Sequence, residues 1–481
     1  MIVHKFGGTS VGNAQRISNV ADIVITHHQQ KRESQREGQP LPETIVVVSA
    51  MCGVTDQLIT GGWAAAEGKD SVYREVKARL LQKHLEVVEN LLNHSPERLE
   101  VGGLVEDRLH DLERLYRSIA MLGEFTVRGC DAVTSLGEQL SASILAAVLR
   151  ERGERAQAIP ATELIVTDDN FGAARPLKAQ TDQRLAQRLL PLTQRGVIPV
   201  VTGYIAATEH GVTTTLGRGG SDFTAAIVGA GLGAEEVWIW SDVDGILTAD
   251  PNIVPEARTL TELSYAEAAE LAYYGADVLH PKTIHPVIES GIPLRILNSF
   301  NPSHPGTLIR LTPDPSRKHL PAIISTTGLT LIAVGTVDDS WTLGMATRAL
   351  QLLSQAGMDV PLFSQSFSEH SLNLVVREQN LAHCLDVLRR EFGNGHSWEQ
   401  VAPGGKYTLG VKEKVATVSV VGFPSWRENG IVSQAFTALG EHGTRVIAVA
   451  QAGTEYSVSF CIPEEQVEST VRFLHHALGL G

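Results

Sequence analysis

Two glycine-rich segments of this 481-residue chain combine an accessible backbone with charged side chains, and the first lies near residue 1. It reads Lys5-Phe6-Gly7-Gly8-Thr9-Ser10 and ends a short apolar run. Gly7 and Gly8 allow the backbone to approach a ligand closely. Thr9 and Ser10 are suited to cap a following helix, whose free N–H groups and dipole favour phosphate. The ammonium of Lys5 would meet a transferring phosphoryl group there, although the Walker A pattern GxxxxGK(S/T) is absent.

The second glycine-rich segment precedes another helical pattern. It reads Thr215-Leu216-Gly217-Arg218-Gly219-Gly220-Ser221-Asp222. Three glycines followed by the capping residues Ser221 and Asp222 indicate a second anion-binding turn. The guanidinium of Arg218 can bind a carboxylate through two parallel hydrogen bonds. Two anion-binding turns in one chain favour a functional role for both.

A third segment has acidic residues at the end of a predicted strand. It reads Trp240-Ser241-Asp242-Val243-Asp244-Gly245-Ile246 and is followed by Ala249-Asp250-Pro251. Acidic and small residues are expected where a nucleotide binds at the carboxyl end of a parallel strand. An EF-hand calcium loop is excluded, because its spacing fails and no glutamate closes it. The 17 histidines include no HExxH pattern, so no dedicated metal site is predicted.

Short β-branched runs alternate with helical patterns over the first 300 residues, and these elements must position the three segments. The predicted strands are Ile2–Phe6, Thr44–Ser49, Val197–Thr202 and Glu236–Ser241. The predicted helices are Asn13–His28, Gly137–Arg152, Asp222–Leu232 and Tyr265–Tyr274. This alternation predicts an α/β domain over residues 1–300, with a mostly parallel sheet covered by helices on both faces. Two helical patterns within residues 71–122 predict an insertion beside the sheet.

A proline-rich stretch at residues 301–321 predicts a linker, and the sequence after it repeats. Each repeat reads strand, helix, strand, strand, helix, which is typical of small ferredoxin-like domains. The repeats predict one domain over residues 322–397 and another over residues 398–481. The second repeat lacks a fourth strand of its own, and we expect Thr307–Leu311 in the linker to supply it as a shared strand.

Charge and cysteine usage exclude several classes of protein. The net charge of −14 opposes nucleic-acid and anionic-membrane partners, because both require a basic surface. The first residues lack the regions of a secretory signal, and no apolar run reaches transmembrane length. The four cysteines are widely separated, which fits a reducing cytoplasm better than a disulfide framework. We therefore expect a cytoplasmic protein.

The three segments and their order resemble the amino-acid kinase family, and further motifs narrow the resemblance to aspartate kinases. These motifs are Ser49-Ala50-Met51-Cys52-Gly53-Val54-Thr55, Gly137-Glu138 and Gly275-Ala276-Asp277-Val278-Leu279-His280-Pro281. The tandem repeats look like ACT domains. The resemblance covers essentially the whole chain and implies an amino-acid kinase fold followed by two ACT domains. It implies ATP-dependent phosphorylation of the side chain of L-aspartate to 4-phospho-L-aspartate, at the entry to lysine, threonine and methionine synthesis.

The resemblance implies how matching residues meet the phosphoryl group and the nucleotide. Lys5, Gly7 and Gly8 would stabilise the charge of the transferring group, so no covalent enzyme intermediate is needed. Asp222 would orient Lys5 or the substrate. Mg²⁺ would arrive on the ATP oxygens rather than in a protein cage. The expected ATP contacts are Lys5, Gly8, Thr9, Ser10, Ser241, Asp242, Leu247, Asp250 and Asp277.

Aspartate itself would lie between residues of opposite charge. Arg218 would hold the α-carboxylate, and Glu138 would receive the ammonium group. The other expected substrate contacts are Ser49, Thr55 and Ser221. Two positions depart from the family pattern, since Asp277 stands where many members have lysine and Leu247 where many have tyrosine. Both departures bear on ATP affinity more than on the reaction.

Paired ACT domains in such kinases typically bind an end-product amino acid, which implies feedback regulation. The effector contacts expected in the first ACT domain are Asp339, Ser340, Gln365, Ser366 and Glu369. In the second domain the equivalent is Gln451, which is followed by Ala452-Gly453-Thr454 instead of the usual serines, so that site is expected to be weaker or structural. Lysine, threonine, both or neither remain open as inhibitors. Docking of ACT sheets edge to edge would give at least a homodimer.

Three hypotheses follow for the function. The first is a feedback-regulated aspartate kinase. The second is a related kinase of glutamate or another acidic substrate, which the Ser49–Thr55 loop and the paired ACT domains disfavour. The third is an amino-acid sensor with a weak kinase half, and only Asp277 favours it because the other expected catalytic residues are present.

Overall fold

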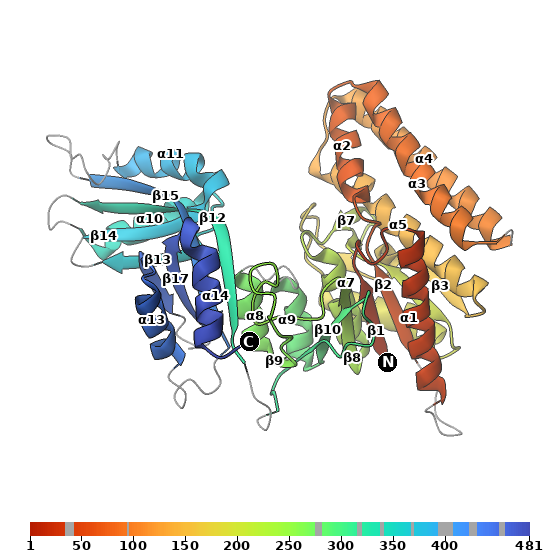
Figure 1. Cartoon of the computed structure of the whole chain (residues 1–481). Helices are drawn as coiled ribbons and strands as arrows, with labels where there is room; N and C mark the ends of the chain where they lie inside the picture. The colour runs from red at the N-terminus through yellow and green to blue at the C-terminus, as the bar shows by residue number, and fades with distance from the viewer. Residues whose placement is uncertain are drawn as a thin grey trace. The chain divides into compact units, whose positions relative to one another are not determined.

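The computed structural model describes most of the chain, and Figure 1 draws the remaining residues as a thin grey trace. The described residues are 1–33, 43–93, 96–274, 281–314, 320–336, 341–366, 370–392, 407–422, 431–451 and 457–481, without the side chains of 281–284, 366 and 431. Internal contacts divide the chain into two compact units. The first unit is Met1–Ile246, Thr261–Tyr265 and Asp277–Asp314, and the second is Leu247–Leu260, Ala266–Ala276 and Pro315–Gly481.

An eight-stranded sheet forms the centre of the first unit, in the order β3-β5-β2-β1-β8-β10-β11-β9. Its neighbouring strands are parallel except for β10 with β11. β1, β2 and β5 are buried along their whole length, as apolar runs in a doubly covered sheet are. The predicted mostly parallel α/β fold is therefore confirmed. The strands are β1 (Ile2–Phe6), β2 (Thr44–Val48), β3 (Ala156–Ile159), β5 (Ile198–Thr202), β8 (Glu236–Ser241), β9 (Glu262–Ser264), β10 (Leu294–Asn298) and β11 (Thr307–Arg310).

Helices cover both faces of this sheet (Figure 1). α1 (Ala14–Glu33) and α5 (Val127–Glu151) pack on the face that carries Phe6 and Trp240. α7 (Gly220–Leu232) packs on the other face, where Gly229 lies against Val237. α5 is long and apolar enough by composition to cross a bilayer, but 83% of its most apolar stretch is buried, which is typical of a core helix. Other elements of the first unit are α6 (Lys178–Thr193), α9 (Pro281–Ser290) and a small sheet of β4 (Val166–Thr167), β6 (Ile205–Thr208) and β7 (Thr213–Thr215), whereas α8 (Tyr265–Tyr273) lies almost entirely in the second unit.

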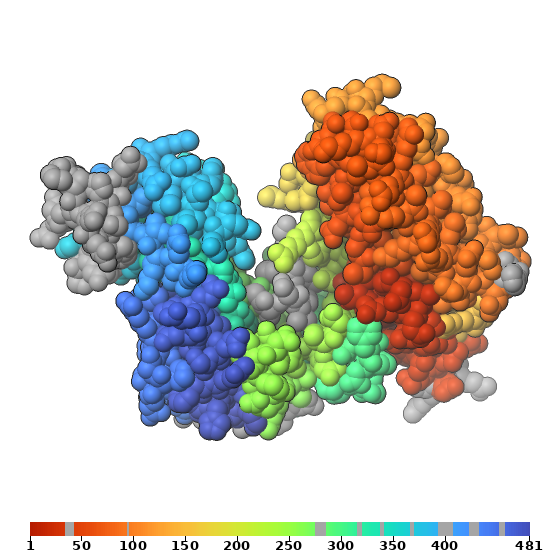
Figure 2. Space-filling model, turned by 45° about the horizontal axis from the view of Figure 1, so that its top comes forward, coloured from red at the N-terminus to blue at the C-terminus, as the bar shows by residue number. Residues whose placement is uncertain are grey.

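The helical insertion consists of α2 (Val54–Ala66), α3 (Asp70–Leu91) and α4 (Pro96–Leu122). Tyr73 of α3 and Tyr116 of α4 are fully buried with ring centroids 5.6 Å apart. The Tyr116 hydroxyl donates to the carbonyl of Leu58 on α2 at 2.8 Å, which ties the three helices together. In Figure 2 the insertion forms an orange surface adjoining the red surface of α1.

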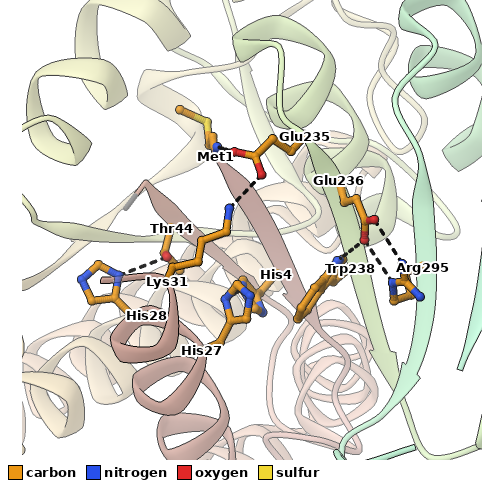
Figure 3. Close-up of polar contacts among 10 residues, drawn as sticks. All are labelled: Met1, His4, His27, His28, Lys31, Thr44, Glu235, Glu236, Trp238 and Arg295. Carbon is orange, nitrogen blue, oxygen red and sulfur yellow. Dashed lines mark hydrogen bonds and ion pairs between the residues drawn. The ribbon is translucent and has the colours of Figure 1, made fainter. Parts of the chain in front are cut away.

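Alternate residues of β1 point to opposite faces of the sheet. His4 lies fully buried on the face covered by α1, with its ring parallel to that of Trp240 and edge-on to that of Trp238. The indole Nε1–H of Trp240 donates to His4 Nδ1 at 3.2 Å, and His4 Nε2 lies 3.2 Å from His27 Nδ1. Figure 3 shows His4, His27 and Trp238 gathered on this face. Lys5 consequently lies on the opposite face, beside α7.

The second unit contains a six-stranded antiparallel sheet in the order β13-β14-β12-β15-β17-β16. The two predicted repeats correspond to the two halves of this sheet, each with two helices. Its elements are β12 (Ala322–Thr336), α10 (Leu343–Gln355), β13 (Leu362–Ser366), β14 (Ser371–Arg377), α11 (Leu381–Phe392), β15 (Tyr407–Val421), α13 (Ile431–His442), β16 (Ala448–Gln451), β17 (Ser457–Pro463) and α14 (Val467–Ala477).

The prediction that Thr307–Leu311 completes the second repeat was wrong. That segment forms β11, which pairs with β10 and β9 in the sheet of the first unit. The two halves of the six-stranded sheet instead exchange strands. Residues 322–326 of β12 pair with residues 417–421 of β15 and complete the second repeat, while residues 407–411 of β15 pair with residues 332–336 and complete the first. The long strands β12 and β15 therefore each serve both repeats.

Candidate active site

An ion pair joins the first two glycine-rich segments. Lys5 is the last residue but one of β1, its side chain is 10% exposed, and its Nζ contacts the carboxylate of Asp222, which is 16% exposed. Asp222 lies in the first turn of α7. The pair is therefore shielded on the sheet side and keeps limited contact with solvent, which strengthens its attraction relative to a surface pair.

The loop after β1 is a tight turn rather than a direct entry into a helix. Gly7 accepts backbone hydrogen bonds from Ser10 and Val11 at 3.0 and 3.2 Å. A Cβ on Gly8 would lie 3.0 Å from the carbonyl oxygen of Ala50, so this position requires glycine. The expectation that Thr9 and Ser10 cap α1 was wrong. The helix begins at Ala14, and Asn13 Oδ1 caps it by accepting the N–H of Arg16 at 3.0 Å.

Ser299, which the sequence analysis did not single out, connects two of the predicted loops. Its hydroxyl lies 2.9 Å from the Ser10 hydroxyl, and its N–H and hydroxyl both donate to the carbonyl of Ser241 at 2.9 Å. Ser299 is 4% exposed and follows β10. A polar residue directly after a buried parallel strand was the signal that could have identified it.

The loop before α7 differs from the expected one, because the expectation that Ser221 and Asp222 cap the helix was wrong: the N-cap is Gly219, which has no side chain to cap the helix. Gly219 has a φ of 70°, which an L side chain adopts only with strain, and α7 begins at Gly220. Ser221 and Asp222 therefore lie in the first helical turn, where backbone N–H groups are free to face an anion. Ser221 is 9% exposed and packs against Gly203, whereas Arg218 is exposed.

Glu138 is a buried carboxyl group on α5. It is 3% exposed, the backbone N–H of Ala50 bonds its carboxylate, and Oε2 has no hydrogen-bond partner in the described part of the chain. Burial raises the pKa of Glu138 to about 8, against a smaller lowering by backbone hydrogen bonds. On the same helix, the Ser141 hydroxyl donates to the Ser49 carbonyl at 2.6 Å. The loop at residues 49–52 thus touches both Glu138 and, through Ala50, the Gly8 turn.

Thr55 and a buried acidic residue also belong to the first unit. Thr55 lies half-buried in the first turn of α2, directly after the residue 49–53 loop. Asp131 lies on α5, seven residues before Glu138, and is 1% exposed. The sequence analysis missed Asp131, although an acidic residue inside an apolar helical pattern was a visible signal.

The residues expected at the nucleotide are divided between the two units. Ser241 ends β8, Asp242 is exposed, and Asp244 Oδ1 accepts from the side-chain amides of Asn298 and Asn301 at 2.9 and 3.1 Å. Leu247 and Asp250 belong to the second unit, together with residues up to Leu260. Asp277 lies outside the described residues.

The segment that begins at Leu247 is held by the last helix of the chain within the second unit. Thr248 Oγ1 lies 2.9 Å from Nε2 of the buried His475 on α14, and the Arg472 side chain donates to the Ile253 carbonyl at 2.8 Å. Asp250 Oδ1 accepts the N–H of Asn252 at 2.9 Å. Leu247 and Asp250, which were expected at the nucleotide, therefore belong to a segment that packs against the last helix of the second ACT-type repeat.

Two of the expected effector contacts have described side chains. Gln365 lies on β13 and Gln451 ends β16, which are the two outer strands of the six-stranded sheet. Ser366 ends β13, but its side chain is not described. Asp339, Ser340 and Glu369 lie outside the described residues.

Comparison with known proteins places this arrangement among amino-acid kinases. Residues 1–298 match the amino acid kinase family, and residues 418–478 match the ACT domain. The chain is 32% identical over 486 residues to "Aspartokinase 1, chloroplastic" of Arabidopsis thaliana, covering 98% of this chain and 79% of that protein. It spans half the length of the bifunctional aspartokinase/homoserine dehydrogenases of Arabidopsis thaliana and Zea mays that it also matches.

Solved structures agree over the whole chain. The crystal structure of E. coli aspartokinase III in complex with aspartate and ADP (R-state) has a TM-score of 0.77 at 28% identity and covers 99% of both chains. The structure of the same enzyme in complex with lysine and aspartate (T-state) has a TM-score of 0.78 at 28% identity and covers 100% of this chain and 99% of that one.

Proposed function

This chain belongs to the aspartokinases of the amino acid kinase family, and on that premise we propose how its own residues phosphorylate the side chain of L-aspartate. The observation that carries the proposal is the Lys5–Asp222 ion pair, because it joins both glycine-rich turns at one point. The product is 4-phospho-L-aspartate, the first intermediate of the aspartate-derived amino acids.

Lys5 acts on the transferring phosphoryl group. Its ammonium neutralises charge that develops on the phosphoryl oxygens, and the backbone N–H groups of Gly7 and Gly8 add donors. Asp222 holds the Lys5 side chain against the sheet, so little reorganisation is needed during the reaction. The side-chain carboxylate of aspartate is itself the nucleophile, so no enzyme group has to form a covalent bond.

Glu138 and Arg218 bind the two groups that every amino acid carries, the α-ammonium and the α-carboxylate. The pKa of about 8 means that Glu138 is mostly a neutral acid at pH 7 when the site is empty. A substrate ammonium placed against its unpaired Oε2 favours the ionised form. Arg218 receives the α-carboxylate, with the N-terminus of α7 beside it. Ser49, Thr55 and Ser221 complete the contacts.

ATP is the phosphoryl donor, since E. coli aspartokinase III binds ADP together with aspartate. Ser10, Ser241 and Asp242 lie at the carboxyl ends of β1 and β8, where a nucleotide is expected. Mg²⁺ would be held mainly by ATP oxygens and would shield the charge of the phosphates. Exposed Asp242 offers one further oxygen ligand of the kind that Mg²⁺ prefers, whereas Asp244 Oδ1 already accepts hydrogen bonds from two side-chain amides.

The ACT repeats regulate this activity. Because E. coli aspartokinase III binds lysine, we propose lysine, threonine or both as effectors of this chain. The outer strands β13 and β16 each expose an edge, which suits pairing of ACT sheets in a homodimer. We also propose a cytoplasmic location, because four widely separated cysteines fit a reducing compartment.

The proposal is tested by ADP release in the presence of hydroxylamine, which traps the acyl phosphate as a hydroxamate. We expect turnover with L-aspartate and MgATP, none above background with L-glutamate, and inhibition by lysine or threonine. Turnover with glutamate alone would support a related acidic amino-acid kinase. Binding of an amino acid without any turnover would support a sensor and contradict the proposed roles.

A further inference from the structure

Asp131 is an almost completely buried carboxylate whose oxygens are taken up by two loops. Oδ2 accepts the N–H of Gly172 at 2.9 Å and the N–H of Thr215 at 3.2 Å. Oδ1 accepts the hydroxyl of Thr215 at 2.7 Å. Because the residue is only 1% exposed, these three hydrogen bonds replace those that water would otherwise make to the carboxylate. A buried carboxylate is costly unless it is satisfied in this way.

The two loops bound by Asp131 also pack on each other beside the Arg218 turn. Ala174 donates its N–H to the Thr215 carbonyl at 2.9 Å. Gly217 has a φ of 76°, and a Cβ there would lie 3.2 Å from the Gly172 carbonyl oxygen. The chain thus passes directly from the residues held by Asp131 to Arg218, which is three residues after Thr215.

Asp131 and Glu138 share one face of α5, because seven residues correspond to about two helical turns. Both are buried on the rigid core helix of the first unit. One end of this face therefore holds the loop of Arg218, and the other carries the carboxyl group of Glu138. The distance between these two groups is set through Asp131.

We propose that Asp131 is a positioning residue which fixes the Arg218 turn relative to Glu138 and so adapts the site to the ammonium and α-carboxylate of one amino acid. The inference rests on the proposed roles of Glu138 and Arg218. Asp131 itself touches no substrate, so its loss weakens aspartate binding and leaves nucleotide binding and the phosphoryl-transfer step nearly unchanged.

The test is steady-state kinetics of the full-length Asp131→Asn variant. Asparagine keeps the shape and can keep its one oxygen against both backbone N–H groups, while its NH2 group faces the Thr215 hydroxyl, but it replaces a charged acceptor by a neutral one, so the grip on the Arg218 turn weakens. We expect the KM for aspartate to rise by about threefold or more, because hydrogen bonds to a neutral acceptor are roughly half as strong as those to a charged one. The KM for MgATP should stay within about twofold and kcat within about threefold.

Ser135→Ala is the matched control, because Ser135 is 3% exposed on the same helix and its hydroxyl donates within α5, to the Ala132 carbonyl. It should leave both KM values unchanged. If Asp131→Asn does not fold, Thr215→Val removes the 2.7 Å hydroxyl contact to Asp131, together with the side-chain hydrogen bond between Thr215 and Tyr204, and should still raise the KM for aspartate several-fold. An unchanged aspartate KM in the folded Asp131→Asn variant, or in Thr215→Val where Asp131→Asn does not fold, would overturn the proposal.

Two further variants separate this inference from the proposed function. Arg218→Ala and Glu138→Ala should each raise the KM for aspartate strongly. If they do not, the proposed substrate contacts are wrong. If they do while Asp131→Asn and Thr215→Val behave like the Ser135→Ala control, only the positioning role is wrong.

Discussion

Lys5 and His4 are neighbours on β1 and occupy opposite faces of the same sheet, yet their surroundings differ completely. Lys5 meets the charged carboxylate of Asp222 beside two glycine-rich turns. His4 meets aromatic rings and His27, under α1 (Figure 3). Both side chains are buried and titratable. Burial of such a group is therefore not a sign of chemistry by itself, whereas burial with a charged partner at an anion-binding turn is.

The face with His4 also shows how a buried histidine is satisfied without charge. Trp240 Nε1 can only donate, so His4 Nδ1 must accept and Nε2 must carry the proton that is donated to His27. Burial first, and then His27, Lys31 and His28, hold the pKa of His4 well below 6.5. The arrangement stabilises strand packing and keeps the His4 ring neutral near pH 7.

The largest effect is expected when the Lys5 ammonium is removed. Lys5→Met removes the ammonium from the transferring phosphoryl group, and kcat should fall on the order of 10²–10³-fold. The thermal unfolding midpoint should also fall, because Asp222 is only 16% exposed and its Oδ1, which contacts Lys5, is buried and would lose its charged partner. Hydroxamate formation at saturating substrates measures the rate, and Lys5→Arg, which keeps the charge, should lose less. Normal turnover by Lys5→Met would remove Lys5 from the mechanism.

Glu138 is a third buried titratable group, and we propose that its shifted pKa serves aspartate binding. Its raised pKa of about 8 means that aspartate binding must ionise it, so affinity should rise roughly tenfold per pH unit from pH 6 toward pH 8. Binding at pH 7 should release nearly one proton, measurable by calorimetry in buffers of different ionisation enthalpy. Glu138→Gln should bind aspartate at least tenfold more weakly and lose this pH dependence. A proton count near zero for the unmodified enzyme would contradict the assignment.

The structural role of His4 is tested by measuring the stability of the protein rather than its reaction rate. His4→Leu leaves the Trp240 indole N–H buried without an acceptor, which should cost about 1–3 kcal/mol of unfolding free energy. Denaturant unfolding of the first unit measures the loss, and kcat should stay within about threefold. A His4→Leu enzyme that is stable but inactive would show that the two faces are not separate in function.

Acid stability gives the smallest predicted effect. Burial, followed by the nearby cations, lowers the pKa of His27 from 6.5 to about 4. Between these values the unfolded chain binds more protons than the folded one, so stability falls as the pH drops from about 6.5 toward 4. From pH 6.5 to 5.5 the loss attributable to His27 should be below roughly 1 kcal/mol. This loss of stability should be absent from the His27→Gln variant. If that variant loses as much stability over the same pH range, the loss comes from other groups.

Much of the fold and part of the site were predictable because the signals are local. Buried β-branched runs gave the positions of β1, β2, β5 and β8, and the glycine-rich turns gave Lys5 and Asp222 as candidates. Strand exchange was not predictable. Both residues 307–311 and residues 322–326 are extended apolar segments, and only tertiary pairing decides which of them completes the second repeat.

The residues missed at the site act through distant partners. Ser299 contacts Ser10 across 289 positions of sequence, and Asp131 contacts Thr215 across 84. No spacing rule connects such pairs. The assignment of Leu247–Leu260 to the second unit likewise depends on packing against α14, through Thr248 and His475, which a linear domain boundary cannot express.

The most direct test of the central claim, that the chemistry lies on the Lys5 face of the sheet, is a crystal structure with aspartate, ADP and Mg²⁺. We predict the aspartate ammonium on Glu138, its α-carboxylate on Arg218 and its side chain directed toward Lys5. The opposite face offers an alternative, a cavity of about 580 Å³ lined in part by His27, Trp238 and Phe300. Aspartate or the nucleotide phosphates bound in that cavity, with the Lys5 face empty, would contradict the claim.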